Sequence, residues 1–161
     1  MTDKKSTSIP KDKAGGSALS PGLTQNCTCF NLRKAARAIT QAYDSALQPS
    51  GIRATQFTLL AVIKAVGPLA LSHLAKTLVM DRTTLTRNLR PLEKQDLIRV
   101  EQGEDRRARI VVLTDKGARA LTRALPLWRR AQGRIVDDLG RESWAGLLGN
   151  LRATVSATFP E

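Results

Sequence analysis

The sequence has few of the residues on which most enzyme sites depend. Its 161 residues include one histidine, His73, and two cysteines, and aromatic residues make up 4% of the chain. No glycine-rich phosphate loop, nucleophile motif or metal-ligand cluster occurs. Asp137 and Asp138 are adjacent, so on a helix they point about 100° apart and do not share an acid/base role. We expect His73 at a helix surface, and we expect neither an enzyme nor a cofactor.

Long apolar runs are also absent. No stretch reaches the roughly 18 consecutive apolar residues of a membrane-spanning helix, and the first 25 residues lack the apolar centre of a signal peptide. The cysteines, Cys27 and Cys29, are separated by one residue, which is no disulfide framework for a secreted fold. We expect one soluble domain in the cytoplasm with no membrane contact.

Basic residues are abundant. Lysine and arginine number 26 against 14 aspartates and glutamates, which gives a net charge of +12 and a sequence pI near 10.7. Such a charge favours a polyanionic partner, with nucleic acid ahead of an anionic membrane surface. Residues 1–25 are polar and carry four lysines, so we predict a disordered basic arm that is either passive or weakly phosphate-binding.

Apolar residues at three- and four-residue spacing predict helices over most of the remaining chain. One stripe runs from Leu32 to Leu47 and ends at Pro49-Ser50-Gly51, and a buried central helix with Thr55 as its N-cap ends at Gly67-Pro68. Two short helices follow, from Ser72 to about Leu78 and from Arg82 to about Gln95, the second capped by Asp81. The tight turn between them is typical of a helix-turn-helix, whose second helix enters the DNA major groove.

Alternating residues after Leu97 predict a two-stranded wing, with Ile98 and Val100 on one strand and Ile110 and Val112 on the other. Thr114 then caps a long helix, and a last helix is predicted to bury an apolar stripe. That stripe contains Trp144, Leu147, Leu148, Leu151 and Val155. The predicted fold is mainly α with a small β-wing, a winged helix-turn-helix in the order αααα-ββ-αα.

The second short helix divides into two faces. Leu85, Leu89 and Leu92 lie on one side, and polar or basic residues lie opposite. Arginine donates two hydrogen bonds to guanine and threonine meets a thymine methyl or a phosphate, so the polar face suits base reading, although an ordinary solvated face is the alternative. Pro91 removes one backbone hydrogen bond and predicts a kink in the second half. The predicted groove-reading residues are Arg82, Thr83, Thr84, Thr86, Arg87 and Arg90.

At the wing turn, Asp105 precedes Arg106 and Arg107. A guanidinium at a hairpin tip can enter a narrow minor groove, and Asp105 is expected to orient it.

The motifs Met80-Asp81-Arg82-Thr83-Thr84-Leu85-Thr86-Arg87, Asp105-Arg106-Arg107 and Leu113-Thr114-Asp115-Lys116-Gly117 closely resemble the MarR family over residues 30–159. The resemblance implies a homodimer held by terminal helices at about 29–48 and 115–159, around a winged helix-turn-helix at about 52–114, within a domain of residues 26–161. It also implies recognition helices that read a pseudo-palindrome in double-stranded DNA and wing arginines in flanking minor grooves. Arg107 matches the family's wing arginine, with Arg106 second. Gln95-Asp96 departs from the family, which usually has a glycine-containing turn there.

Two regulatory sites are candidates. Arg33, Arg37, Tyr43 and Trp128 are candidates to line an effector site for an aromatic or anionic compound. Cys27 and Cys29 precede the first long helix, where a thiol gains reactivity, and two such pairs across a dimer axis would supply an inter-subunit disulfide or four metal-binding sulfurs. Small apolar packing residues are the alternative for both cysteines.

The predicted function is a transcriptional repressor released from DNA by a small ligand or by thiol modification. An architectural or constitutive DNA-binding protein without an effector is the alternative.

Overall fold

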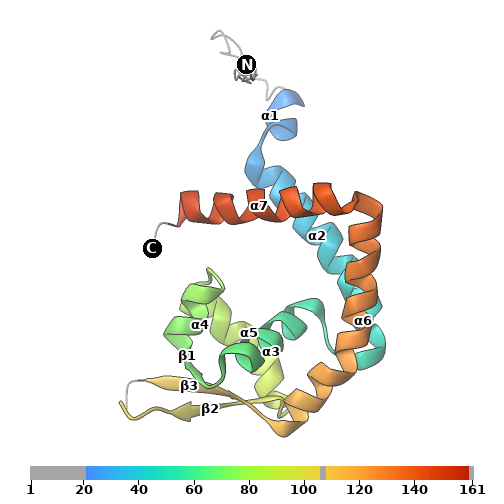
Figure 1. The fold of residues 1–161 in the computed structure, drawn as a ribbon. Helices are drawn as coiled ribbons and strands as arrows, with labels where there is room; N and C mark the ends of the chain where they lie inside the picture. The colour runs from blue at the N-terminus through green and yellow to red at the C-terminus, as the bar shows by residue number, and fades with distance from the viewer. Residues whose placement is uncertain (1–20, 106–107, 160–161) are drawn as a thin grey trace. The chain divides into compact units, whose positions relative to one another are not determined.

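The computed structural model describes residues 21–105 and 108–159, and helices dominate them (Figure 1). Contacts within the chain define two compact units, residues 1–36 and 37–161. The predicted basic arm falls mainly on residues 1–20, which lie outside the described part. Residues Pro21–Gln25 form helix α1, which the sequence analysis did not predict. Helix α2 (Thr28–Leu47) follows, and a single 3-10 turn, η1 (Gln48–Ser50), ends it before Gly51.

Helix α3 (Ala54–Val66) is the centre of the core. Phe57, Leu59, Leu60 and Ile63 are all buried, in agreement with the prediction of a helix that is apolar nearly all round. The predicted N-cap, Thr55, is wrong. The N-cap is Arg53, two residues before Thr55. Ala54 N–H donates to Asp44 Oδ1 of α2 at 2.7 Å, so this acceptor comes from elsewhere in the fold.

The wing belongs to a three-stranded antiparallel sheet in the order β1-β3-β2. β2 (Ile98–Gln102) and β3 (Arg109–Leu113) form the predicted hairpin, with Val100 opposite Val111. β1 (Leu69–Ala70) is only two residues long and pairs with the other edge of β3, where Leu69 faces Val111. The sheet thus ties the start of the helix-turn-helix to the wing.

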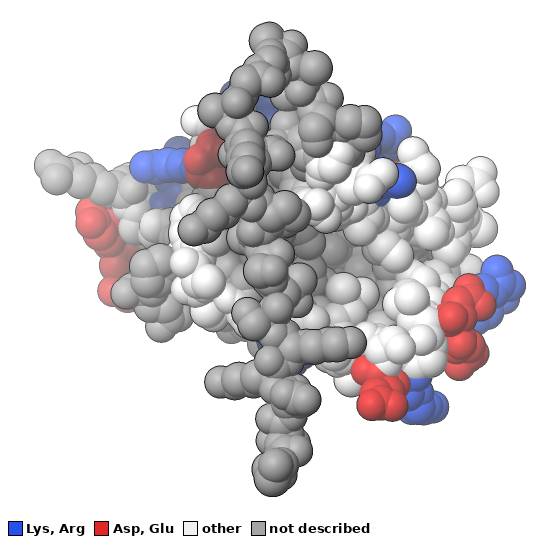
Figure 2. Space-filling view, turned by 90° about the horizontal axis from the view of Figure 1, so that it is seen from above, with Lys and Arg blue, Asp and Glu red and all other residues white. Residues whose placement is uncertain are grey.

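Two long helices complete the chain. α6 (Asp115–Leu139) packs on α3, and α7 (Arg141–Thr158) follows after Gly140. The prediction that α7 buries its apolar stripe is wrong for the single protomer, since none of its residues is buried and Leu147 and Val155 are exposed. The view in Figure 2 shows uncharged side chains over much of the area that the grey residues leave visible, with charged side chains toward its margins. Within the described residues, no helix has the length and apolar character that a membrane span requires.

Candidate nucleic-acid interface

Two short helices and the turn between them form the base of the candidate interface. α4 (Leu71–Thr77) packs through Leu71, Leu74 and Ala75, and α5 (Arg82–Lys94) follows after a tight turn. Val79 within this turn has φ +52°, a left-handed conformation that is rare for a β-branched residue. The chain therefore reverses over a few residues, which confirms the predicted helix-turn-helix.

Helix α5 begins where the sequence predicts. Asp81 Oδ1 accepts a hydrogen bond from Thr84 N–H at 2.8 Å, as an N-cap does. Hydrogen bonds from Thr84 lower the pKa of Asp81 below its ordinary value. The helix continues through Pro91 to Lys94, so the missing N–H of Pro91 does not end it.

The two faces of α5 differ as predicted. Leu85, Leu89 and Leu92 are buried, and they anchor the helix on the core. Thr84 is half-buried beside the cap. The exposed side carries Arg82, Thr83, Thr86, Arg87 and Arg90. Thr86 Oγ1 donates to Arg82 O at 2.8 Å, so its hydroxyl hydrogen is used within the helix and its oxygen can still accept a hydrogen bond.

The arginines of this face are available for a ligand. Among residues 21–105 and 108–159, the ion pairs are Arg99 Nε with Glu101 Oε1 at 3.4 Å and Lys116 Nζ with Asp96 Oδ2 at 3.7 Å. Neither involves Arg82, Arg87 or Arg90. The exposed face of α5 therefore presents positive charge that no described carboxylate neutralises, which suits a polyanion.

Two hydrogen bonds in the wing hairpin join residues on either side of positions 106–107. Gly103 N–H donates to Ala108 O and Ala108 N–H donates to Asp105 O, both at 2.8 Å. Asp105 is exposed, whereas Arg106 and Arg107 lie outside the described residues. Their predicted roles in the minor groove, and the orienting role of Asp105, stay predictions. Arg109, exposed on β3 beside this turn, is a further basic wing residue that the sequence analysis did not consider.

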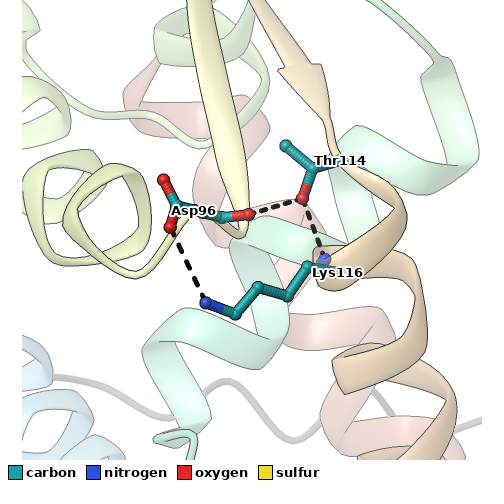
Figure 3. A network of polar contacts seen from close by, with 4 residues as sticks. Asp96, Thr114 and Lys116 are labelled. Carbon is teal, nitrogen blue, oxygen red and sulfur yellow. Dashed lines mark hydrogen bonds and ion pairs between the residues drawn. The ribbon is translucent and has the colours of Figure 1, made fainter.

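A polar joint connects the end of α5 to the start of α6 (Figure 3). Thr114 Oγ1 donates to Asp96 O at 2.6 Å and accepts from Gly117 N–H at 3.0 Å, which confirms Thr114 as the N-cap of α6. Asp96 has φ +54°, so it adopts without glycine the left-handed turn that the family usually builds with glycine. The joint thus connects the end of the recognition helix, α5, to the start of the long helix, α6, beside a buried glycine, Gly117.

The candidate effector residues are only partly brought together. Tyr43 and Trp128 stack with ring centroids 6.4 Å apart, and Trp128 also stacks on Phe57 at 5.7 Å. Tyr43 Oη donates to Gln132 Oε1 at 2.5 Å, and burial raises the pKa of Tyr43. These four side chains line a hollow of about 270 Å³.

The two predicted effector arginines are not among the residues that line this hollow. Arg37 is exposed and does not line this hollow, and Arg33 is exposed in the first unit. Phe57 and Gln132 also line the hollow and were not predicted from the sequence. The four-residue spacing of Trp128 and Gln132 was a signal for the second of them.

Both cysteines are free thiols at the start of α2. Cys27 is half-buried and its Sγ accepts from Phe30 N–H at 3.4 Å, the arrangement of a helix N-cap, whereas Cys29 is exposed. No group of three or more metal-ligating side chains occurs in the described part of one protomer.

Comparison with solved structures gives close matches over most of the chain. The M. tuberculosis transcriptional regulator MosR in complex with DNA is 42% identical, covers 80% of this chain and is itself covered to 98%, with a TM-score of 0.69. The transcriptional repressor CouR bound to a 23-mer DNA duplex is 28% identical, covers 86% of this chain and is covered to 99%, with a TM-score of 0.74.

Sequence comparison agrees. The family model described as the MarR family matches residues 52–108. The organic hydroperoxide resistance transcriptional regulator of Bacillus subtilis is 32% identical over 95 residues, which are 58% of this chain and 65% of that protein. The HTH-type transcriptional regulator YwoH of Bacillus subtilis is 30% identical over 83 residues, 52% of this chain and 61% of that protein. The chain thus spans less than two thirds of the length of these two relatives. All four are transcriptional regulators rather than enzymes, and this chain belongs to the MarR family.

Proposed function

We propose that this protein is a transcriptional repressor that binds a pseudo-palindromic site in double-stranded DNA as a homodimer. The exposed face of α5 carries the proposal, because three unpaired arginines and two threonines stand on a helix that a buried leucine row holds in place. The two relatives solved with DNA support it, since they share the fold over at least 80% of this chain.

The residues have distinct roles in this proposal. Arg82, Thr83, Thr84, Thr86, Arg87 and Arg90 face the major groove or its phosphates. Residues near the N-terminus of a recognition helix make most base contacts, and Arg87 is the first choice for bidentate hydrogen bonds to guanine. Arg107, and secondarily Arg106, enters the minor groove from the wing, where Asp105 orients it.

Binding to a duplex selected from random sequence tests these roles. Fluorescence anisotropy at fixed salt should show that Arg87→Ala loses about 1–3 kcal/mol and relaxes the base preference at one position per half-site. Arg107→Ala should weaken binding and reduce its salt dependence. Arg152, exposed on α7, supplies a control of equal charge change, and Arg152→Ala should bind as wild type does.

Two results contradict this assignment. Wild-type affinity in both Arg87→Ala and Arg107→Ala at matched salt would refute the docking. Nearly equal wild-type affinity for the selected and the random duplex would favour an architectural DNA-binding protein without an effector.

Thiol oxidation is the first proposed means of release from DNA. Cys27 lies at the N-cap of α2 and Cys29 is exposed, so an oxidant reaches a thiol at a helix terminus. The organic hydroperoxide resistance regulator among the relatives supports this reading. One thiolate attacks the peroxide, releasing an alcohol and leaving a sulfenic acid. A second thiol, from the same or the partner chain, then displaces water to form a disulfide.

A gel-shift titration with an organic hydroperoxide tests the thiols. Wild-type protein should leave the DNA as oxidation proceeds, and a thiol reductant should restore binding. Cys27→Ser and Cys29→Ser should each resist release. Mass spectrometry should verify that both thiols are modified. If the DNA affinity is then unchanged, the cysteines have only a packing role. Release by a thiophilic metal without oxidation would instead favour a metal site with sulfur ligands.

A small aromatic ligand is the second proposed means of release. The hollow beside Tyr43, Phe57 and Trp128 offers stacked rings and one polar pair, Tyr43 with Gln132. Neither predicted arginine, Arg33 or Arg37, lines the hollow, so the Tyr43–Gln132 pair is the proposed partner for a polar substituent of the ligand. Quenching of tryptophan fluorescence by an aryl carboxylate that is lost in Tyr43→Ala would support this site, whereas quenching that persists there would contradict it.

A further inference from the structure

Helix α6 carries a basic ridge along one side. Its members are Lys116, Arg119, Arg123, Arg130 and Arg134, all of them exposed. At about 100° and 1.5 Å per residue, they fall within a sector of about 60° and extend over about 27 Å. Among the described residues only Lys116 has an ion-pair partner, Asp96. The other four ridge residues have no ion-pair partner among the described residues, although Asp138 lies four residues beyond Arg134 and lines the same groove.

Two ridge residues border the most spacious of the described hollows. Arg130 and Arg134 line a groove of about 430 Å³ between α2 and α6, a volume within the range of small-molecule sites. The floor is apolar and formed by small or aliphatic side chains. They are Ala42, Ala46, Leu127, Ala131 and Ile135.

This groove is distinct from the hollow beside Tyr43 and Trp128. The two share no lining residue, and they use different sides of α6. The aromatic hollow offers rings for stacking, whereas the lining of the groove contains no aromatic ring. A flat aromatic body therefore gains more in the first hollow, and an alkyl body fits the second.

We propose that the groove binds an amphipathic carboxylate with an alkyl body, the chemistry of a medium-chain fatty acid. Arg130 and Arg134 stand four residues apart on one helix face, where both guanidiniums reach a single carboxylate. The alkyl chain covers the alanine and leucine floor. Asp138 also lines the groove, and its charge opposes a carboxylate close to Arg134, so Arg130, eight residues away from Asp138, is the stronger contact for the head group.

Calorimetric titration of the full-length protein with dodecanoate, below its micelle concentration and without DNA, tests this site. Wild-type protein should bind in a saturable manner, and dodecanol, which lacks the carboxylate, should bind at least about tenfold more weakly. Arg130→Gln with Arg134→Gln should weaken dodecanoate binding at least about tenfold. Ala42→Trp, at an exposed lining position, should block the tail and keep the arginines.

A matched control separates the site from the general charge. Arg129→Gln with Arg152→Gln removes the same charge from exposed positions that do not line the groove, and it should bind dodecanoate as wild type does. The inference goes beyond the proposed function, because the titration needs no DNA and a failed repressor assignment leaves its outcome unaffected.

Four results would overturn the inference. The first is absence of saturable binding by wild-type protein. The second is equal binding by the Arg130→Gln, Arg134→Gln variant. The third is binding that Tyr43→Ala abolishes, which would locate the ligand in the aromatic hollow. The fourth is loss of the dimer in the double arginine variant by light scattering, which would assign both arginines to the subunit interface.

Discussion

Val79 is the residue whose backbone conformation least suits its side chain. An L-residue in the left-handed region costs roughly 1–2 kcal/mol, and β-branching adds to that strain. Glycine avoids this strain, although its greater conformational freedom in the unfolded chain cancels about 0.5–1 kcal/mol of the stability gained. Val79→Gly should therefore stabilise the protein by about 0.5–1 kcal/mol in chemical unfolding. The side chain is 43% exposed, so little packing is lost.

A second valine provides the control. Val66 ends α3, is 55% exposed and is not among the residues with positive φ. Val66→Gly should destabilise the protein, because glycine at this position increases the conformational entropy of the unfolded chain and relieves no backbone strain in the folded one. Destabilisation by Val79→Gly of the same size would show that the turn is not strained.

Asp81 makes the start of α5 sensitive to pH. Hydrogen bonds from Thr84 lower the pKa of Asp81 in the folded protein, so the carboxylate stabilises the fold above its unfolded pKa of 3.8. This contribution is lost as the pH falls through the lower, folded value. The stability difference between wild type and Asp81→Ala should thus be largest near pH 7 and shrink toward about pH 3 in urea titrations. A difference that grows on acidification would contradict the cap.

The joint between helices α5 and α6 depends on Gly117. A Cβ at this position would lie 2.0 Å from Leu97 O and 2.9 Å from Leu113 Cδ1. Leu97 O already accepts from Thr114 N–H at 3.2 Å, so the backbone around it has little room to move. Gly117→Ala should cost about 1–3 kcal/mol of stability and weaken DNA binding, since the recognition helix ends at this joint.

Gly133 supplies the opposite case within the same helix. A Cβ there meets no atom within 4 Å, so Gly133→Ala should raise stability by about 0.5–1 kcal/mol through the helix propensity of alanine. Both variants are checked by chemical unfolding. If Gly117→Ala raised the stability and Gly133→Ala lowered it, crowding at Leu97 O would not govern the stability of the joint.

Elements that depend on local patterns were predictable from the sequence, and those that depend on distant partners were not. The leucine row of α5 and the caps Asp81 and Thr114 follow from spacing and residue type. β1 escaped prediction because two residues become a strand only by pairing with β3, some forty residues later. Thr55 was the wrong cap because the helix starts at Ala54, whose N–H donates to Asp44 of another helix.

The same distinction applies to the candidate site. The exposed face of α5 could be predicted, because a helix that packs by one row of leucines presents the opposite row to solvent. The hollow of Tyr43, Phe57 and Trp128 depends on how α2, α3 and α6 come together, which the spacing within each helix does not specify. Arg37 was therefore predicted to line this hollow, and in the structure it does not.

Helix α7 lacks a partner for its apolar residues within the described part of the protomer. It has 18 residues, none of them buried, although Trp144, Leu148 and Leu151 are half-buried and Leu147 and Val155 are exposed. A helix with this many apolar residues normally buries a stripe, and a large exposed apolar surface usually marks an interface. A second copy related by a two-fold axis would cover it with the same surface of its own.

We therefore expect a homodimer at micromolar concentration, which multi-angle light scattering measures. Leu147→Lys with Val155→Lys should shift the protein toward monomer, because each lysine brings a charge into the apolar contact. DNA affinity should fall with it, since a monomer engages one half-site where a dimer engages two. Val66→Lys changes another exposed valine, on α3, and should leave the dimer intact. A wild-type monomer that unfolds cooperatively at micromolar concentration would refute the dimer, and would leave the apolar residues of α7 to a different partner.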